Sequence, residues 1–295
     1  MKKWLLVIRS PFLILSVVLA LLGTSIAWYD GFFHLGHALL AFLGLLLAHI
    51  STNVFNEYFD YRSGIDLETQ RTPFSGGSGA LPAGLLSAKQ ALWLGITCLL
   101  LATGIGIYFV IVSGWLLLPL LLVAVICIVF YTPVILRIKW PEWAAGLGMG
   151  SLPVMGAYFV QTGAYNWPLV IAAVPSGILV YNLLLLNEFP DVEADKNAGR
   201  QTTPIVSGRR KAAAIYSTMT LAVYLWLIIA AATEVIPAFS LLGLLTLPLA
   251  IKAIKGSFQY EDMGKLVPAM ASNVMVVLLT QLLVGIGYII SGAIS

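Results

Sequence analysis

Residues 88–112 read AKQALWLGITCLLLATGIGIYFVIV, a run whose single charged residue, Lys89, stands at its second position. A helix needs about 20 mostly apolar residues to cross a bilayer, so this run predicts a membrane-spanning helix. The composition agrees, because 60% of the 295 residues are hydrophobic and 10% are charged. Soluble domains carry about 25% charged residues, so we predict that lipid surrounds much of this chain.

Eight other segments share this length and apolar character, and each predicts a spanning helix. They are residues 11–28, 36–61, 114–136, 143–162, 168–190, 210–232, 236–254 and 268–292. The first of them is long enough to span and lacks a small-residue cleavage site, so we expect no cleavable signal peptide. The predicted fold class is an all-α integral membrane protein with nine transmembrane helices.

The basic residues test this count of nine. If the N-terminus is cytoplasmic, all sixteen lysines and arginines lie before the first span, in the inner loops or at the inner ends of the spans. The predicted outer loops hold only Asp30 and Glu234 as charged residues. Cytoplasmic loops are enriched in lysine and arginine, so we predict a multi-pass protein of the plasma membrane with a cytoplasmic N-terminus. The net charge of +3 is too small to indicate a nucleic-acid partner.

The acidic residues are just as uneven, because eight of the thirteen lie in two windows, residues 57–68 and 188–195. The windows stand at the inner ends of the second and sixth predicted spans, so both reach the same cytoplasmic face. An asparagine stands directly before each window: Asn56 and Asp60 are four residues apart and share one helix face. The second window repeats this spacing with Asn187, Asp191 and Asp195.

The two windows also resemble each other in sequence. A shift of 131 residues gives seven identities in 22 positions, among them Asp60 with Asp191. Within a single transmembrane domain, residues 1–295, this predicts two parallel four-helix halves, roughly 1–136 and 137–254, plus a ninth helix at 268–292. Chance similarity between turn-rich segments is the alternative explanation.

Carboxylates gathered at one membrane face repel one another unless a cation lies between them. The candidate ligands are all oxygens, which favours magnesium or calcium over zinc. Magnesium is usually held by one or two carboxylates and completes its shell with water and substrate phosphate. We therefore predict a magnesium and diphosphate site whose metal ligands are Asp60, Asp66, Asp191 and Asp195. The alternative is that these acids only form ion pairs with loop arginines and lysines.

Basic side chains beside the acids are candidates for binding the phosphate oxygens that the metal leaves free. Arg71, Lys139 and Arg200 are preferred for their position, although the topology rule explains every basic residue equally well. The full candidate set for binding diphosphate is Asn56, Arg71, Lys139, Asn187, Arg200 and Arg9. The glycine-rich loop Ser75–Gly79 could present backbone N–H groups to phosphate, or serve as a lid or a plain linker.

The histidines and cysteines add no site to this prediction. His34, His37 and His49 lack metal-ligand partners at useful spacing and are treated as ordinary residues. Cys98 and Cys127 each lie inside an apolar run, which indicates packing rather than a disulfide framework.

Two motifs carry a family resemblance. Residues 56–66, NEYFDYRSGID, and residues 187–195, NEFPDVEAD, resemble the two aspartate-rich motifs of the UbiA superfamily of intramembrane prenyltransferases. Residues 131–139, YTPVILRIK, resemble the tyrosine–lysine element of that family, and NEFPD looks most like its menaquinone-type (MenA-like) branch. The resemblance spans nearly the whole chain. One position departs from the common pattern: Gly64 stands where many members have the second aspartate of the first motif, and the acid here is Asp66.

The resemblance implies helices around a central cavity that is capped on the cytoplasmic side. It implies a Mg²⁺-dependent transfer of a polyprenyl group from a polyprenyl diphosphate to an aromatic acceptor resembling 1,4-dihydroxy-2-naphthoate, as in lipid-quinone biosynthesis. In this reaction the allylic diphosphate ionises and the acceptor attacks the carbocation. Tyr131 and Lys139 are the candidate catalytic residues. The Tyr131 ring could stabilise the cation through its π face, and simple packing is the alternative.

Other functions stay open. The same chemistry on another acceptor, such as a 4-hydroxybenzoate-like compound, a porphyrin or a lipid headgroup, fits the same motifs. A secondary transporter is the alternative from another class, since the chain has many spans and an internal repeat. A transporter needs polar groups near the membrane midplane, whereas these acids lie at one face. The length of the prenyl donor and the oligomeric state are not indicated by the sequence.

Overall fold

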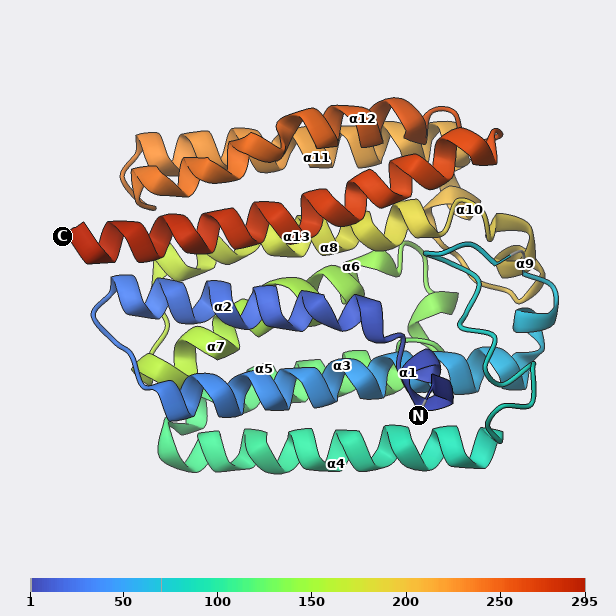
Figure 1. Cartoon of the computed structure of the whole chain (residues 1–295), viewed down its shortest axis with the longest axis horizontal. Helices are drawn as coiled ribbons and strands as arrows, with labels where there is room; N and C mark the ends of the chain where they lie inside the picture. The colour runs from blue at the N-terminus through green and yellow to red at the C-terminus, as the bar shows by residue number, and fades with distance from the viewer. Residues whose placement is uncertain (1, 70, 295) are drawn as a thin grey trace.

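The structure is a computed structural model that describes residues 2–69 and 71–294, and within them every regular element is a helix. Figure 1 shows the long helices lying side by side, with short helices and loops at the ends of the bundle. The α-helices are α1 Lys2–Val7, α2 Ile14–Tyr29, α3 Leu35–Ser63, α4 Ala88–Val112, α5 Leu118–Phe130, α6 Glu142–Gly146, α7 Leu152–Thr162, α8 Trp167–Asn187, α9 Val192–Asn197, α10 Thr203–Ser207, α11 Arg209–Ala232, α12 Leu247–Ser257 and α13 Met263–Ile294. The 3₁₀-helices are η1 Ser10–Leu13, η2 Ile65–Leu67, η3 Trp115–Leu117, η4 Ile135–Arg137 and η6 Ala238–Thr246. The segment η5 Leu147–Ser151 is a π-helix.

Eight helical stretches among the described residues are long and apolar enough to cross a membrane, which confirms a multi-pass membrane protein. They follow the predicted spans closely, and α4 has the predicted bounds, 88–112. The predicted span 114–136 differs, because its apolar helix covers only Trp115–Phe130. Pro133 explains the early end, since proline lacks an N–H and disfavours helical geometry in the residue before it. The count of nine spans therefore stays a prediction.

Large apolar side chains cover the outside of the bundle. On α4, Trp93, Leu100 and Ile111 are all exposed, and Ile111 keeps 78% of its surface accessible. Exposed apolar surface on this scale marks contact with a membrane. We therefore expect lipid acyl chains to contact these exposed side chains.

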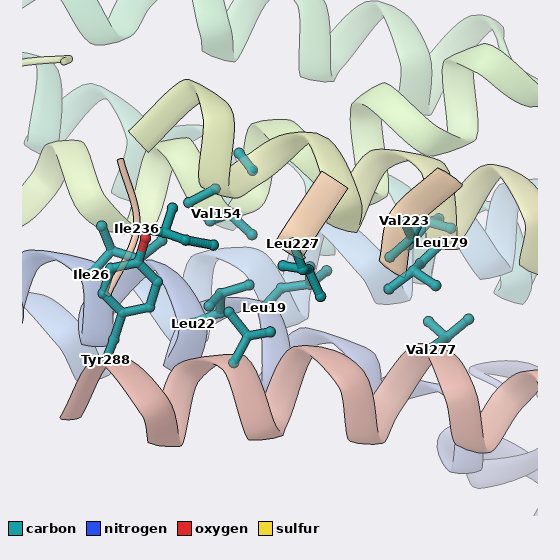
Figure 2. Close-up of a cluster of buried hydrophobic side chains, with 14 of the residues drawn as sticks. Leu19, Leu22, Ile26, Val154, Leu179, Val223, Leu227, Ile236, Val277 and Tyr288 are labelled. Carbon is teal, nitrogen blue, oxygen red and sulfur yellow. The ribbon is translucent and has the colours of Figure 1, made fainter. Parts of the chain in front are cut away.

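The core of the bundle lies between α2, α7, α8, α11 and α13. Figure 2 shows part of this cluster of side chains and labels Leu19, Leu22, Ile26, Val154, Leu179, Val223, Leu227, Ile236, Val277 and Tyr288. Small residues allow the backbones to approach closely, as in other membrane helix pairs. At Gly23 on α2, an added Cβ would clash with the carbonyl oxygen of Val154 on α7. Any larger residue at Gly23 would therefore separate these two helices.

The second acidic window does not continue its helix. We expected Asn187, Asp191 and Asp195 to follow one another along one helix, but α8 ends at Asn187 and α9 begins at Val192. Pro190 lies in the break and accounts for it, since its ring is incompatible with a helix interior. Asp191 and Asp195 remain one turn apart, because Asp195 N–H donates to Asp191 O at 2.8 Å. Figure 1 places α9 and α10 at the same end of the bundle as the segment that follows α3.

Candidate active site

The two acidic windows meet across one guanidinium group. Nη1 of Arg200 donates to Oδ1 of Asp195 at 2.8 Å, and Nη2 of Arg200 donates to Oδ1 of Asp60. The side chains of Arg200, Asp60 and Asp195 are only 15%, 10% and 4% exposed. The end of α3 and the short helix α9 are therefore joined by a nearly buried charge cluster.

Two further acids of the windows are buried without full hydrogen bonding. Oδ2 of Asp66 and Oδ1 of Asp191 have no hydrogen-bond partner among the described residues. Burial, together with the nearby carboxylates of Asp60 and Glu57, raises the pKa of Asp66 to about 7. Burial likewise raises the pKa of Asp191 to about 7, with Asp195 adding to the effect and the backbone of Gly76 opposing it. Neither carboxylate forms an ion pair within the described residues, although nearby arginines partly oppose the rise in pKa.

This arrangement fits a magnesium ion whose shell is completed by a ligand. The unpartnered buried side-chain atoms of residues 56–66 and 187–195 are all oxygens, among them Oδ2 of Asp66, Oδ1 of Asp191 and Oδ1 of Asn187. Within residues 2–69 and 71–294, no group of three or more histidine, cysteine or acidic side chains is arranged to hold a metal ion. Magnesium commonly takes one or two carboxylates and leaves its other positions to water and phosphate, so an open set of oxygens suits it.

Glu57 fixes the glycine-rich loop against the acids. Its side chain is fully buried, and Oε1 accepts hydrogen bonds from Arg9 Nε at 2.8 Å and from Ser78 N–H at 2.6 Å. Oε2 accepts from the Ser78 hydroxyl at 2.6 Å. At Gly77, an added Cβ would lie 2.8 Å from Oδ1 of Asp66. The loop Ser75–Gly79 is thus a wall of the site, held by a glutamate that our motif analysis did not assign.

The corresponding glutamate of the second window, Glu188, is buried beside another acid. Both of its carboxyl oxygens lack a hydrogen-bond partner among the described residues. Burial and the neighbouring Glu142 raise the pKa of Glu188 well above its usual value, which favours its protonated form. Oε1 of Glu142 accepts from Thr203 N–H at 2.5 Å. The recurrence of Asn-Glu in both windows was the sequence signal for Glu57 and Glu188.

A cavity of about 200 Å³ opens below these groups. Four of the predicted site residues line it, namely Arg9, Asn56, Tyr131 and Asn187. The Tyr131 hydroxyl has no hydrogen-bond partner among the described residues, and burial raises its pKa well above the usual 10, so it remains a neutral phenol. A second cavity of about 320 Å³ has almost entirely apolar walls, and Ile128, Gly148 and Met149 line both cavities. Two of these three belong to the π-helix η5, an irregularity frequent at functional sites.

The structure places the other predicted basic residues in different surroundings. Arg9 donates to Glu57 and, at 3.3 Å, to Oδ1 of Asn56, so it stands at the mouth of the cavity. Arg71 is exposed, but its positive charge lowers the pKa of Asp66 and therefore acts on the site. Lys139 is exposed and forms no ion pair with a described acid. Its predicted role in binding or catalysis stays a prediction.

The fold and this site define a multi-span membrane protein with an oxygen-rich, charged end above an apolar cavity. The model of the UbiA prenyltransferase family matches residues 16–285, so the chain belongs to that family of transferases. Its relatives include the 1,4-dihydroxy-2-naphthoate octaprenyltransferase of Bacillus subtilis, 30% identical over 96% of this chain and 91% of the relative. The Escherichia coli enzyme of the same name is 26% identical over 98% and 96%. The expected membership of the menaquinone-type branch is confirmed.

Solved structures share the fold. A UbiA homologue from Aeropyrum pernix K1 superposes with a TM-score of 0.74 at 18% identity, covering 95% of this chain and 98% of that one. A UbiA homologue from Archaeoglobus fulgidus, in a structure bound to GPP and Mg²⁺, gives a TM-score of 0.63 at 16% identity over 97% and 99%. The all-helical membrane fold predicted from the sequence is therefore confirmed.

Proposed function

We propose that this protein transfers a polyprenyl group from a polyprenyl diphosphate to 1,4-dihydroxy-2-naphthoate or a close analogue, with magnesium as cofactor. The relatives from B. subtilis and E. coli carry the name of this activity. The observation that carries the proposal is the meeting of Asp60 and Asp195 above a cavity that continues into apolar walls. A polyprenyl diphosphate fits this arrangement, because its charged diphosphate would lie beside the acids and its long apolar tail in the cavity.

In this proposal Asp60, Asp66, Asp191 and Asp195 hold the magnesium, which when bound acts as a Lewis acid on the leaving diphosphate. Arg9 and Arg200 neutralise diphosphate oxygens at the mouth of the cavity, and Arg200 exchanges part of its bonding to the acids for bonds to the substrate. The bond between the allylic carbon and oxygen breaks and leaves its electron pair on the diphosphate. An acceptor ring carbon then forms the new carbon–carbon bond, and the ring regains its aromaticity by releasing the group that this carbon carried, either a proton or, where it carried a carboxylate, CO₂.

The chain's own residues also protect the reactive centre. Water in the cavity would capture the allylic cation as an alcohol, so the site has to exclude it. The loop Ser75–Gly79, tied to Glu57, closes the charged end. The neutral Tyr131 presents an aromatic ring in the cavity wall, where its π face can stabilise the cation. The apolar second cavity receives the tail of the donor.

The test is prenyl transfer by the purified protein in liposomes, with geranylgeranyl diphosphate, magnesium and a panel of acceptors, and with products identified by mass. We expect a prenylated naphthalene product, and we expect Asp60→Ala and Asp191→Ala to reduce its formation by at least about 100-fold. Full activity in both variants would refute the metal assignment. The panel includes glyceryl phosphates, since a 27% identical relative is named digeranylgeranylglyceryl phosphate synthase. A product from those alone would refute the naphthoate acceptor.

We also propose that this charged end faces the cytoplasm, because every basic residue lies on that side of the predicted topology. Lys89 and Ala164 are both exposed, at opposite ends of the bundle. In intact cells a membrane-impermeant thiol reagent should label the Ala164→Cys variant and not the Lys89→Cys variant. Labelling in the reverse order would overturn the orientation. The native Cys98 and Cys127 are buried and should not react.

A further inference from the structure

A line of polar side chains runs down the cavity face of α3. His49, Thr52, Asn53 and Asn56 all line the first cavity. Their spacing of three, four and seven residues places them on one face of the helix. Since α-helices rise 1.5 Å per residue, His49 lies about 10 Å deeper in the membrane than Asn56. The line therefore leads from the diphosphate end of the cavity to its interior.

Only one nitrogen on this line is both deep and available. The Thr52 hydroxyl donates to its own helix, at Ala48 O, and the Asn53 amide donates to Ile8 O at 3.0 Å. Nδ1 of His49 is hydrogen-bonded to the Ser16 hydroxyl at 2.9 Å, which fixes the direction of the ring. Nε2 of His49 has no hydrogen-bond partner within residues 2–69 and 71–294. The deep end of the cavity thus offers an unused hydrogen-bonding atom.

Ser16 and His49 lie deep in the membrane, where burying polar groups costs free energy, so a purely structural role does not account for this hydrogen-bonded pair. His49 is the middle residue of the 29-residue helix α3, and Ser16 on α2 is fully buried. Ionisable residues at such depth are rare in membrane proteins and commonly mark a functional site. If the hydrogen bond between Ser16 and His49 served only to join α2 to α3, it would not require Nε2 of His49 to stand at the cavity wall. Nε2 therefore calls for a polar partner that the chain itself does not supply.

We propose that His49, held by Ser16, hydrogen-bonds a ring hydroxyl of the prenyl acceptor and so determines acceptor specificity. This inference rests on the proposed function and adds the residue that recognises the acceptor. A hydroxyl both donates and accepts, so it pairs with His49 in either tautomer. Most of the deep lining is apolar, for example Ile128, Met149 and Val277. An acceptor hydroxyl there would lose its hydrogen bonds to water, and the loss would be uncompensated unless His49 formed a hydrogen bond in their place.

The experiment compares steady-state kinetics of wild type with His49→Leu, His49→Gln and Ser16→Ala, varying acceptor and donor separately. We expect His49→Leu to raise the acceptor KM about 10- to 100-fold and to leave the donor KM within about twofold. His49→Gln retains a polar group and should recover part of the loss. An acceptor that lacks one hydroxyl should react more poorly than its parent with wild type, and nearly equally with its parent in His49→Leu.

Ser51→Ala is the matched control for Ser16→Ala. Ser51 is also fully buried, and it lies on α3, but its hydroxyl donates to Gly95 O on α4 rather than to a cavity residue. Ser16→Ala should raise the acceptor KM and Ser51→Ala should not. An unchanged acceptor KM in the His49 variants, or equal changes for donor and acceptor, would overturn this inference while leaving the proposed function intact. Failure of the wild type to prenylate any hydroxylated aromatic ring would overturn both.

Discussion

Asp60 on α3 and Asp195 on α9 bind the same guanidinium, that of Arg200. Two buried carboxylates this close would repel each other, and the arginine removes that repulsion in the absence of another cation. The site therefore carries an internal positive charge at the position where we propose that the metal and diphosphate bind.

Removing that charge should destabilise the metal-free protein. Arg200→Met leaves two buried carboxylates without a partner, and such losses cost about 3 kcal/mol or more. Thermal unfolding in detergent should show a lower midpoint for Arg200→Met, and magnesium should restore more of the loss than it adds to wild type. Lys265→Met is the control, since its pair with Asp262 is long, 3.7 Å, and more than half exposed. Equal effects of magnesium on wild type and Arg200→Met would contradict the shared site.

Glu57→Gln should release the glycine-rich loop. The neutral amide weakens the bond to Arg9 and cannot accept hydrogen bonds with both of its atoms, so Ser78 loses one of its two attachments. We expect faster proteolytic cleavage within residues 71–87 and a loss of activity on the order of tenfold. Glu68→Gln, which changes an exposed acid in the same segment, should alter neither. Unchanged protease resistance in Glu57→Gln would show that the loop is fixed by other contacts.

Stability should depend on pH in opposite ways with and without magnesium. The pKa values of Asp66 and Asp191 are raised from 3.8 to about 7, so the folded metal-free protein holds protons that the unfolded chain has lost. Its stability should fall as pH rises from about 4 to 7. Magnesium competes with these protons, so its stabilising effect should grow from pH 6 to 8. Unfolding midpoints measured across this range check both trends. A metal-free midpoint that rises with pH would contradict the first.

Gly77→Ala should impair the site beyond its cost in backbone strain. Gly77 and Gly84 both have positive φ, 73° and 66°, so alanine is strained at either position by about 1 kcal/mol. Only at Gly77 would the new Cβ also press on Asp66, since nothing lies within 4 Å of it at Gly84. We expect similar stabilities for the two variants and a several-fold lower magnesium affinity for Gly77→Ala alone. Equal magnesium affinities would show that Asp66 moves freely or is not a ligand.

Much of the architecture was predictable because it depends on local properties. Hydropathy marked the spans, and residue spacing marked Asn56 and Asp60 as neighbours on one face of α3. The break after Asn187 was harder to predict, because Pro190 could either bend the membrane helix or end it. The short helix before Tyr131 was missed for a similar reason, since Pro133 stands within a run that is apolar on both sides.

The sequence could not predict which side chains bind one another within the site. The bond of Arg200 to Asp60 joins residues 140 positions apart, and the bonds that Glu57 accepts come from Arg9 and Ser78, 48 and 21 positions away, so only tertiary packing decides them. Glu142 belongs to the start of an apolar span, where nothing in the pattern indicated contact with Glu188. The sequence gives His49 no metal-ligand partner at useful spacing, so it predicts no role for this residue. Its depth in the membrane was the signal that it differs from His34 and His37.

The shortness of the helix Trp115–Phe130 has a consequence for the lipid around the protein. Its sixteen residues rise about 24 Å, whereas the hydrocarbon layer of a typical bilayer is about 30 Å thick. Exposed apolar side chains such as Leu122 and Ile126 cover its outer side, so acyl chains touch it directly. The bilayer has to thin locally along this helix, at a modest free-energy cost for each ångström of mismatch. The protein is therefore expected to prefer membranes with shorter or more disordered acyl chains, and to respond to their composition.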